Sequence, residues 1–363
     1  MTIVCTGRVF ILVYVALAAA AYAEEPAAKK FTCATCHRQE AQSQPKTPMG
    51  IGLQLPPDQS VLKEHPHLTL AWKGYTYSIE RKGDLSYYTV SDGVSSMTLP
   101  IRYAFGVFSQ TYALEHEGHF YESMVSYYPN AGGLAPTMGD ERIQAHSLVD
   151  AIGRQTSTDE ITKCFGCHSS DAVKDGQMHL ESIKPGVDCE HCHSGANAHM
   201  EALARGDPKV MPKKFTKMAS EDMSNFCGNC HRTWDTVVRM RTWGEMNVRF
   251  QPYRLAMSKC FLGNDRRIGC TACHNPHADV VRDDPKHYDA KCLACHPTSG
   301  DGGAKAVLGT TDISSQPATS KFCPVAREAC VTCHMPKVEL PGSLALFTDH
   351  YIRVAPKGER YPD

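Results

Sequence analysis

Short runs of alternating hydrophobic and polar residues dominate the part of the chain between residues 65 and 130. The runs form two pairs, residues 75–80 with 85–90 and residues 110–115 with 119–128. Lys82-Gly83-Asp84 separates the first pair and Glu117-Gly118 separates the second. Period-two alternation interrupted by turn residues is typical of β-hairpins. The pattern therefore predicts a small antiparallel β module near the N-terminus, which we place at residues 61–135.

The start of the chain has a different hydrophobic pattern. Arg8 precedes an apolar run at residues 9–21, and Ala21-Tyr22-Ala23 follows as a small-residue cleavage site. This combination is typical of a secretory signal peptide. We therefore expect residues 1–23 to be removed and the mature protein to be exported, to the periplasm or the outer surface of the cell. An uncleaved membrane anchor is the alternative, but the run is short for a spanning helix.

The rest of the chain has few regular hydrophobic patterns. Within residues 140–160 the spacing is that of a helix, from Arg142 to Gly153, and His146 lies on it. Beyond residue 164, short helical runs alternate with much loop, including a Gly-, Ser- and Thr-rich loop near residues 300–320. Hydrophobic residues make up 42% of the sequence, which is slightly low for a globular protein. This region therefore needs an apolar interior from a source other than its own side chains.

The cysteines indicate that source. Fourteen of the 17 cysteines form seven Cys-x-x-Cys pairs, and a histidine follows each pair directly. We number these motifs 1 to 7 in chain order: Cys33, Cys36 and His37; Cys164, Cys167 and His168; Cys189, Cys192 and His193; Cys227, Cys230 and His231; Cys270, Cys273 and His274; Cys292, Cys295 and His296; Cys330, Cys333 and His334.

Cys-x-x-Cys-His is the attachment signature of a c-type haem. Its two thiols add to the two vinyl groups of one porphyrin, and the histidine becomes the proximal iron ligand. Zinc knuckles and redox dithiols also use paired cysteines, but neither needs a histidine after each pair. We therefore predict seven covalently attached haems. Residues 24–60 would hold the first haem and a connector, and residues 136–363 a multihaem domain with haems 2–7.

The predicted fold class is thus a multihaem cytochrome c, with short α-helices and loops around stacked haems in addition to the β module. Cys260 and Cys323 lie outside the motifs. In an exported protein two such cysteines favour a disulfide, and two separate thiols are the alternative.

Eleven further histidines could provide the second axial ligand of each iron. This number exceeds seven, which favours bis-histidine, low-spin haems. Met49 is an alternative ligand for the first haem. A fully capped iron shuttles electrons, whereas an open iron leaves room for a substrate. The candidates that we favour from their settings are His350, His277, His199, His179, and His65 or His67.

Charge excludes one class of partner and suggests one use of the basic residues. Lys and Arg total 38 and Asp and Glu 39, so a nucleic-acid binder is not expected. Haem propionates are acidic and need cationic partners when buried. A group of basic residues near motif 5 would neutralise propionates or form a docking surface for an acidic redox partner: Arg249, Arg254, Lys259, Arg266 and Arg267.

Several segments resemble exported multihaem c-type cytochromes related to the cytochrome c-552/c-554 group. They are the sequence from Cys189 to His199, Phe226 to Arg232, Arg249 to Leu255, Cys330 to Lys337, and Phe347 to His350. The resemblance covers residues 150–363 and extends to pentahaem nitrite reductases and octahaem reductases. It implies closely spaced haem pairs and distal ligation by His350, His277, His199 and His179. Nitrite reductases of this kind use lysine at the catalytic haem, whereas all seven motifs here end in histidine.

These observations predict an exported heptahaem electron carrier. Its expected partners are other redox proteins, such as membrane-bound quinol oxidoreductases or other multihaem cytochromes, with no role for nucleic acid. One alternative is a reductase with one open iron that acts on a small nitrogen or sulfur oxyanion or on hydroxylamine, with Tyr253, Arg254, Lys259 or His287 as proton donor. Another is a homo-oligomer, such as a unit of a cytochrome filament.

Overall fold

A computed structural model describes residues 31–107, 109–261, 267–296, 323 and 325–362. The predicted signal peptide at residues 1–23, the loop near 300–320 and Arg266 lie outside the described residues. Within the described part of the chain, no helix combines the length and the apolar composition that a membrane span requires.

A four-stranded antiparallel meander forms the first half of the β module. Its strands, in spatial as well as chain order, are β2 (His67–Trp72), β3 (Tyr75–Lys82), β4 (Leu85–Ser91) and β5 (Ser96–Pro100). Lys82 pairs with Leu85, which confirms the hairpin predicted around Gly83. Tyr77, Ile79, Tyr88 and Val90 point inward, because alternate residues of a strand share one face.

A second sheet extends beyond the predicted module at both ends. Its order is β1 (Leu53–Gln54), β6 (Tyr103–Phe105), β7 (Thr111–His116), β8 (His119–Ser123) and β11 (Gly153–Gln155). His116 pairs with His119, so the predicted second hairpin is confirmed. The single strand predicted at residues 119–128 is divided at Met124, and β9 (Val125–Tyr128) pairs with β10 (Gly133–Pro136) instead.

The helix predicted at residues 140–160 is wrong in length. Residues 142–147 are not helical, and α4 (Leu148–Ile152) begins only at Leu148, with the Ser147 hydroxyl accepting a hydrogen bond from the Asp150 backbone at its start; α5 (Thr158–His168) then begins at Thr158. Between these helices the chain joins the sheet, because Gly153 pairs with Ser123 of β8. At φ 154° Gly153 lies so close to the Glu122 carbonyl that any side chain would overlap it. The helix thus ends at Gly153 as predicted, and the chain enters the sheet at the same residue.

The rest of the chain consists of short helices, turns and small hairpins. The helices are α1 (Cys33–Cys36), α2 (Arg38–Ser43), α3 (Ser60–Glu64), α5 (Thr158–His168), α6 (Cys189–Cys192), α7 (Ala196–Ala204), α8 (Ser220–His231), α9 (Trp234–Met240), α10 (Gln251–Ala256), α11 (Cys270–Cys273), α12 (Asp289–Leu293) and α13 (Val331–His334). The 3-10 turns are η1 (Gln44–Lys46), η2 (Pro129–Ala131), η3 (Leu180–Ser182) and η4 (Gly244–Arg249). The small hairpins pair β12 (Ser169–Ser170) with β15 (Lys184–Pro185), β13 (Val173–Lys174) with β14 (Gln177–Met178), and β16 (Lys337–Leu340) with β17 (Ala345–Thr348).

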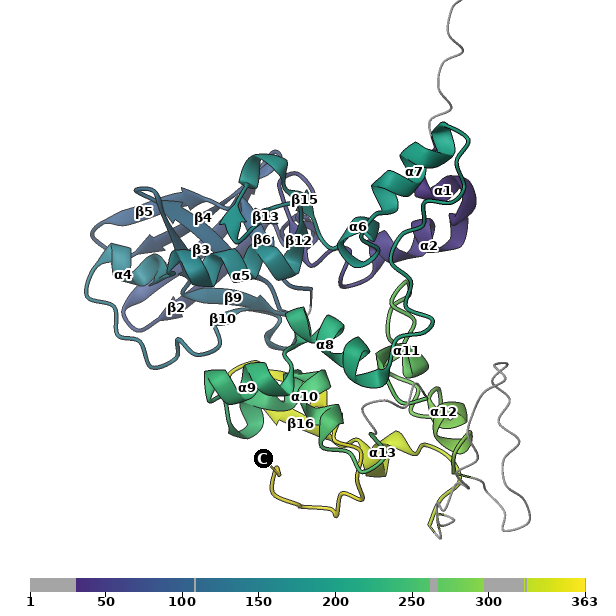
Figure 1. Ribbon diagram of the computed structural model, residues 1–363. Coiled ribbons are helices and arrows are strands. Elements are labelled where there is room, and N and C mark those ends of the chain that lie inside the picture. Colours follow the sequence, from purple (N-terminus) through teal and green to yellow (C-terminus); the bar gives the residue numbers. More distant parts are fainter. Residues whose placement is uncertain (1–30, 108, 262–266, 297–322, 324, 363) are drawn as a thin grey trace, which may run out of the picture.

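Hydrophobic side chains are buried unevenly between these two parts. The two larger clusters lie within and beside the β-sheets, between Leu53 and Ile183. In the region of short helices the described cluster is small and contains Val237, Phe250 and Tyr253. Figure 1 shows the β-rich part on one side, with helices α8 to α13 as a looser group beside it. The interior of the helical group is therefore largely not made of side chains.

Candidate functional site

Each of the seven motifs is built around one helical turn. In α1, α6 and α11 the motif is the whole helix, and in α5 and α8 it is the last turn. The histidine backbone N–H closes the turn on the first cysteine carbonyl, at 2.8 Å in motif 1 and 2.7 Å in motif 3. Residues three and four positions apart lie on the same side of a helix. Both thiols and the imidazole can thus face one ligand.

A single large cavity connects the motifs. Its volume is about 3030 Å³, which is several times the roughly 300–1,000 Å³ of a site for one small ligand. Of the 21 motif residues only Cys164 does not line it. Its walls come from segments as far apart as Phe31 and Ala355. The cavity explains why the helical region has few buried hydrophobic residues, and its size fits several porphyrins.

Hydrogen bonds set the orientation of three motif histidines. The Nδ1 atom lies 3.0 Å from the Gly52 carbonyl in His168, 3.0 Å from the Lys213 carbonyl in His193 and 2.9 Å from the Arg353 carbonyl in His334. A carbonyl oxygen can only accept, so Nδ1 donates and Nε2 keeps its lone pair. This is the tautomer that binds a metal through Nε2. The residues of the cavity therefore fit c-type haems.

Contacts between thiols arrange the motifs in a spatial order that differs from chain order. The Cys33 thiol of motif 1 lies beside that of Cys189 in motif 3, and the Cys167 thiol of motif 2 lies beside that of Cys230 in motif 4. Two further contacts join motif 4 to motif 5 and motif 6 to motif 7, namely Cys227 with Cys270 and Cys292 with Cys330.

Two close approaches complete this order. Cys192 of motif 3 lies near both cysteines of motif 4, and Cys273 of motif 5 lies near Cys292 of motif 6. The motifs therefore follow one another as 1, 3, 4, 5, 6 and 7, with motif 2 beside motif 4. In Figure 1, α1 and α2 lie next to α6 and α7, in agreement with the first step of this series.

All 18 histidines lie in the part of the chain that the structure describes. Four of those outside the motifs line the cavity: His191, His199, His277 and His350. The Nδ1 atoms of His199 and His350 bond to carbonyls, at 2.6 Å from Val210 and 3.0 Å from Thr348. Burial, together with nearby His274, lowers the pKa of His350 to about 4. It is therefore neutral at physiological pH, which is the form that binds a metal.

Two of these histidines face a motif histidine at a distance that suits ligation of one iron. The ring centres are 6.0 Å apart for His193 and His277, and 6.1 Å apart for His274 and His350. A metal–imidazole nitrogen bond is about 2 Å long and the ring centre lies about 1 Å further. Two imidazoles on opposite sides of one metal therefore have centres about 6 Å apart. Burial lowers the pKa of His277 and His274 as well.

The remaining predicted ligands lie away from the cavity. The His65 Nε2 atom is 2.8 Å from the Tyr127 hydroxyl, so the atom that would bind iron already has a partner. His179 lies beyond hairpin β13–β14 with its Nδ1 atom 3.1 Å from Glu181, and His67 is exposed at the start of β2. His146 is also exposed, whereas Met49 lines the cavity. The four non-motif histidines at the cavity are therefore fewer than the seven predicted irons, and the expected excess of distal ligands is not found in this arrangement.

The predicted group of basic residues does not form one surface. Arg254 is fully buried and makes a two-pronged ion pair with Asp349, with N–O distances of 2.8 and 2.9 Å. The interpretation of Arg254 as a propionate partner or proton donor is therefore wrong, because its charge is already compensated. Lys259 and Arg267 line the cavity. Burial lowers the pKa of Arg249, which lies near Glu122.

The predicted Cys260–Cys323 disulfide is also not formed. Both residues are free cysteines, and Cys323 is exposed. Cys260 lies instead near Cys295 and Cys273, with its thiol partly buried beside motifs 5 and 6.

Several residues that orient the histidines gave no signal in the sequence. Gly52, Lys213 and Arg353 act through their backbone carbonyls, whose chemistry is the same in every residue. Gln251 contacts His231 through its side chain. Only Asp349, next to His350, could be noticed as a polar residue beside a ligand.

Two comparisons relate the chain to known proteins. Residues 136–194 match the family described as cytochrome c554 and c-prime. The crystal structure of the outer cell wall cytochrome OcwA is similar over 88% of this chain and 78% of its own, with 12% sequence identity and a TM-score of 0.43. No curated protein matches the chain in sequence.

Proposed function

We propose that this chain, a multihaem c-type cytochrome of the cytochrome c554 group, is an exported heptahaem carrier that transfers electrons between redox partners. When bound, each haem supplies reversible one-electron chemistry. The protein holds the haems close together, orients their axial ligands and limits the access of water. The observation that supports this most directly is the single cavity lined by all seven motifs.

The thiol contacts support a continuous path rather than separate sites. They join motif 1 through motifs 3, 4, 5 and 6 to motif 7, with motif 2 as a branch at motif 4. Electrons that enter near one end of this series can leave near the other. Motif 4 is the junction, because it adjoins motifs 2, 3 and 5.

We assign two distal ligands on geometric grounds. His277 would cap the iron of motif 3 opposite His193, and His350 the iron of motif 5 opposite His274. His199 is the candidate for motif 1, because neighbouring Met200 contacts Cys33. The assignment of His65 and His179 from the sequence has no comparable support.

Haem counting and spectroscopy of the purified protein test this proposal. We expect seven haems per chain by pyridine haemochrome assay and mass spectrometry, predominantly low-spin ferric signals, and rapid reoxidation of the reduced protein by a soluble multihaem cytochrome. A stoichiometry below seven, or haems that cannot exchange electrons with one another, would contradict it.

The histidine count favours a second candidate, a multihaem reductase. Only four non-motif histidines line the cavity for seven irons, and His191 lies within motif 3 itself. At least one iron could then be open to a small oxyanion or hydroxylamine. Binding of cyanide or nitrite to a high-spin haem, with turnover of hydroxylamine, would support the reductase, whereas seven low-spin signals without such binding would exclude it.

The compartment and the partners are also part of the proposal. The apolar run at residues 9–21 and the Ala21-Tyr22-Ala23 site support export, and cleavage would leave Glu24 as the first residue. The partners would be membrane-bound quinol oxidoreductases or other multihaem cytochromes, or further copies of this chain in an oligomer or filament. N-terminal sequencing of the secreted protein and electron microscopy of its assemblies test these points.

A further inference from the structure

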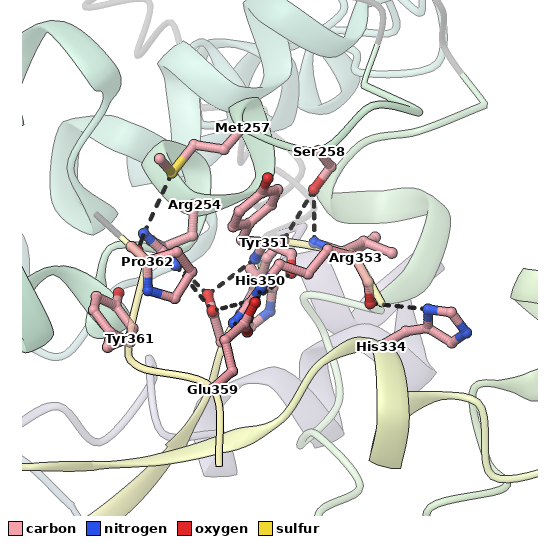
Figure 2. A network of polar contacts seen from close by, with 12 residues as sticks. Arg254, Met257, Ser258, His334, His350, Tyr351, Arg353, Glu359, Tyr361 and Pro362 are labelled. Carbon is pink, nitrogen blue, oxygen red and sulfur yellow. Dashed lines mark hydrogen bonds and ion pairs between the residues drawn. The ribbon is translucent and has the colours of Figure 1, made fainter. Parts of the chain in front are cut away.

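A buried ion-pair network joins helix α10 to the C-terminal segment beside the cavity. Arg254 and Asp349 are both fully shielded from solvent, and their side chains form two parallel N–H to oxygen bonds. Arg353 donates a third bond to the same carboxylate at 2.8 Å. Arg254 uses its remaining nitrogen to bond with the Pro362 carbonyl at 2.8 Å (Figure 2). The network thus holds the segments around Asp349 and Pro362 against α10.

Asp349 constrains the next residue, His350, from two sides. Its carboxylate accepts a bond from the Tyr351 backbone at 3.0 Å, and its own N–H bonds to the Pro336 carbonyl at 2.9 Å. The Ser258 hydroxyl contacts the His350 carbonyl at 3.3 Å. These bonds fix the backbone on both sides of the imidazole. The His350 ring is therefore held at its distance from His274 by groups outside the cavity.

The same carboxylate is connected to His334 through Arg353. The Arg353 guanidinium bonds to Asp349. The Arg353 backbone carbonyl accepts a hydrogen bond from His334 Nδ1 at 2.9 Å, and the Arg353 backbone N–H donates to the His334 carbonyl at 3.2 Å. Figure 2 shows Arg353 between His350 and His334. One buried acidic group thus lies behind a distal candidate for motif 5 and the motif histidine of haem 7.

We propose that Asp349 is a positioning residue shared by two haem irons, which orients His350 toward the iron of motif 5 and His334 toward the iron of motif 7. The inference rests on the proposed ligation by His350. It adds that the two ligand geometries are coupled, because both depend on one carboxylate and its two arginines. Removing that carboxylate should therefore change two haems, whereas removing His350 should change one.

Four variants of the full-length haem-loaded protein test this inference. His350→Ala is the reference for loss of the ligand itself. Asp349→Asn removes the charge, and the double variant Arg254→Met with Asp349→Leu removes both buried charges, so that neither remains unpaired. Glu359→Gln is the control, because it loses only the partly exposed ion pair with Arg353. Haem content, high-spin ferric signals, carbon monoxide binding and individual haem potentials are measured.

We expect His350→Ala to bind one more carbon monoxide per chain than the wild type. Asp349→Asn and the double variant should show the same gain and, in addition, an altered low-spin signal and potential at a second haem. Glu359→Gln should match the wild type in all four measurements.

Each other result has a definite meaning. An Asp349 double variant with seven haems and wild-type spectra overturns the inference, and a change confined to one haem overturns the shared role. General loss of haems in both Asp349 variants shows a purely structural role instead. If His350→Ala gains no carbon monoxide site, the proposed ligation fails independently of the role of Asp349.

Discussion

At the scale of single residues, backbone carbonyls help to fix the imidazoles of three motifs. His168 illustrates this, because Gly52 provides its hydrogen-bond partner and also packs against its ring. A Cβ atom on Gly52 would lie 3.4 Å from His168 Nδ1 and 3.2 Å from the Pro48 carbonyl. The absence of a side chain at Gly52 therefore helps to set the position of the His168 ring, the predicted proximal ligand of haem 2.

Gly52→Ala should shift the His168 ring and lower the free energy of unfolding by about 1 kcal/mol through overpacking. The expected signature is a changed low-spin signal from a single haem, measured by electron paramagnetic resonance together with urea unfolding. Gly133→Ala is the matched control, because a Cβ there meets no atom within 4 Å. Identical spectra for the Gly52 variant and the wild type would contradict the prediction.

Asp140 provides a pH-dependent prediction within the β-rich part. It is 4% exposed, and one of its oxygens has no partner among the described residues. Burial, together with nearby Glu122, raises its pKa from 3.8 to about 7. The folded state then keeps a proton that the unfolded chain releases above about pH 4, so stability falls as the pH rises toward 7.

Asp140→Asn should therefore be more stable than the wild type by roughly 1–3 kcal/mol at about pH 8, because the buried charge is gone. The difference in stability should vanish below about pH 4, where Asp140 is protonated in the folded as well as in the unfolded chain. Urea unfolding at several pH values measures it, with Asp84→Asn at an exposed turn as the control. A constant difference across the pH range would show that Asp140 does not titrate in this way.

At the scale of elements, one motif residue supports the helix that follows its own motif. Glu190, between the cysteines of motif 3, accepts backbone hydrogen bonds from Gly195 and Asn197, each at 2.8 Å. These are N–H groups at the start of α7, which have no partner within the helix. Because α7 contains His199, the motif and a distal candidate are mechanically connected.

Glu190→Ala should free the start of α7 and lower stability by roughly 1–3 kcal/mol, since two bonds to a charged group are lost. Increased hydrogen exchange confined to α7 and a changed signal from the haem that His199 is proposed to cap are the expected results. Glu201→Ala on the same exposed helix should leave both unchanged. Equal hydrogen exchange in the two variants would show that Glu190 does not stabilise the start of α7.

At the scale of the whole molecule, the two halves of the chain are stabilised differently. The two larger buried side-chain clusters lie between Leu53 and Ile183, whereas the short helices have one small cluster and surround a cavity of about 3030 Å³. Porphyrin burial would supply the missing apolar contacts there. The β-rich part should therefore not depend on haem for its fold, and the helical part should.

Chain produced without haem attachment should accordingly yield a protease-resistant fragment of roughly residues 51–183, whereas residues beyond it should be degraded. The reason is that an apolar core resists local opening and an unfilled cavity does not. Limited proteolysis with mass spectrometry of the haem-free and haem-loaded proteins measures this. Equal protection of the C-terminal half in both forms would show that its helices are stable without haem.

The sequence alone was sufficient wherever the information is local. Cysteine–cysteine–histidine spacing within one helical turn identified the motifs, residues 136–194 match the cytochrome c554 and c-prime family, and two hairpins formed at the turns predicted for them. These features depend on neighbours within a few residues. For this reason alternation and spacing could predict them without knowledge of the fold.

The tertiary structure decided everything that joins distant segments. It left residues 142–147 outside the predicted helix and Cys260 and Cys323 as free thiols, paired His65 with Tyr127, and placed His350 opposite His274. It also gave Arg254 a buried partner 95 residues away. No local pattern encodes such pairs, because they arise only when strands, ion pairs and the shared cavity bring separate parts of the chain together.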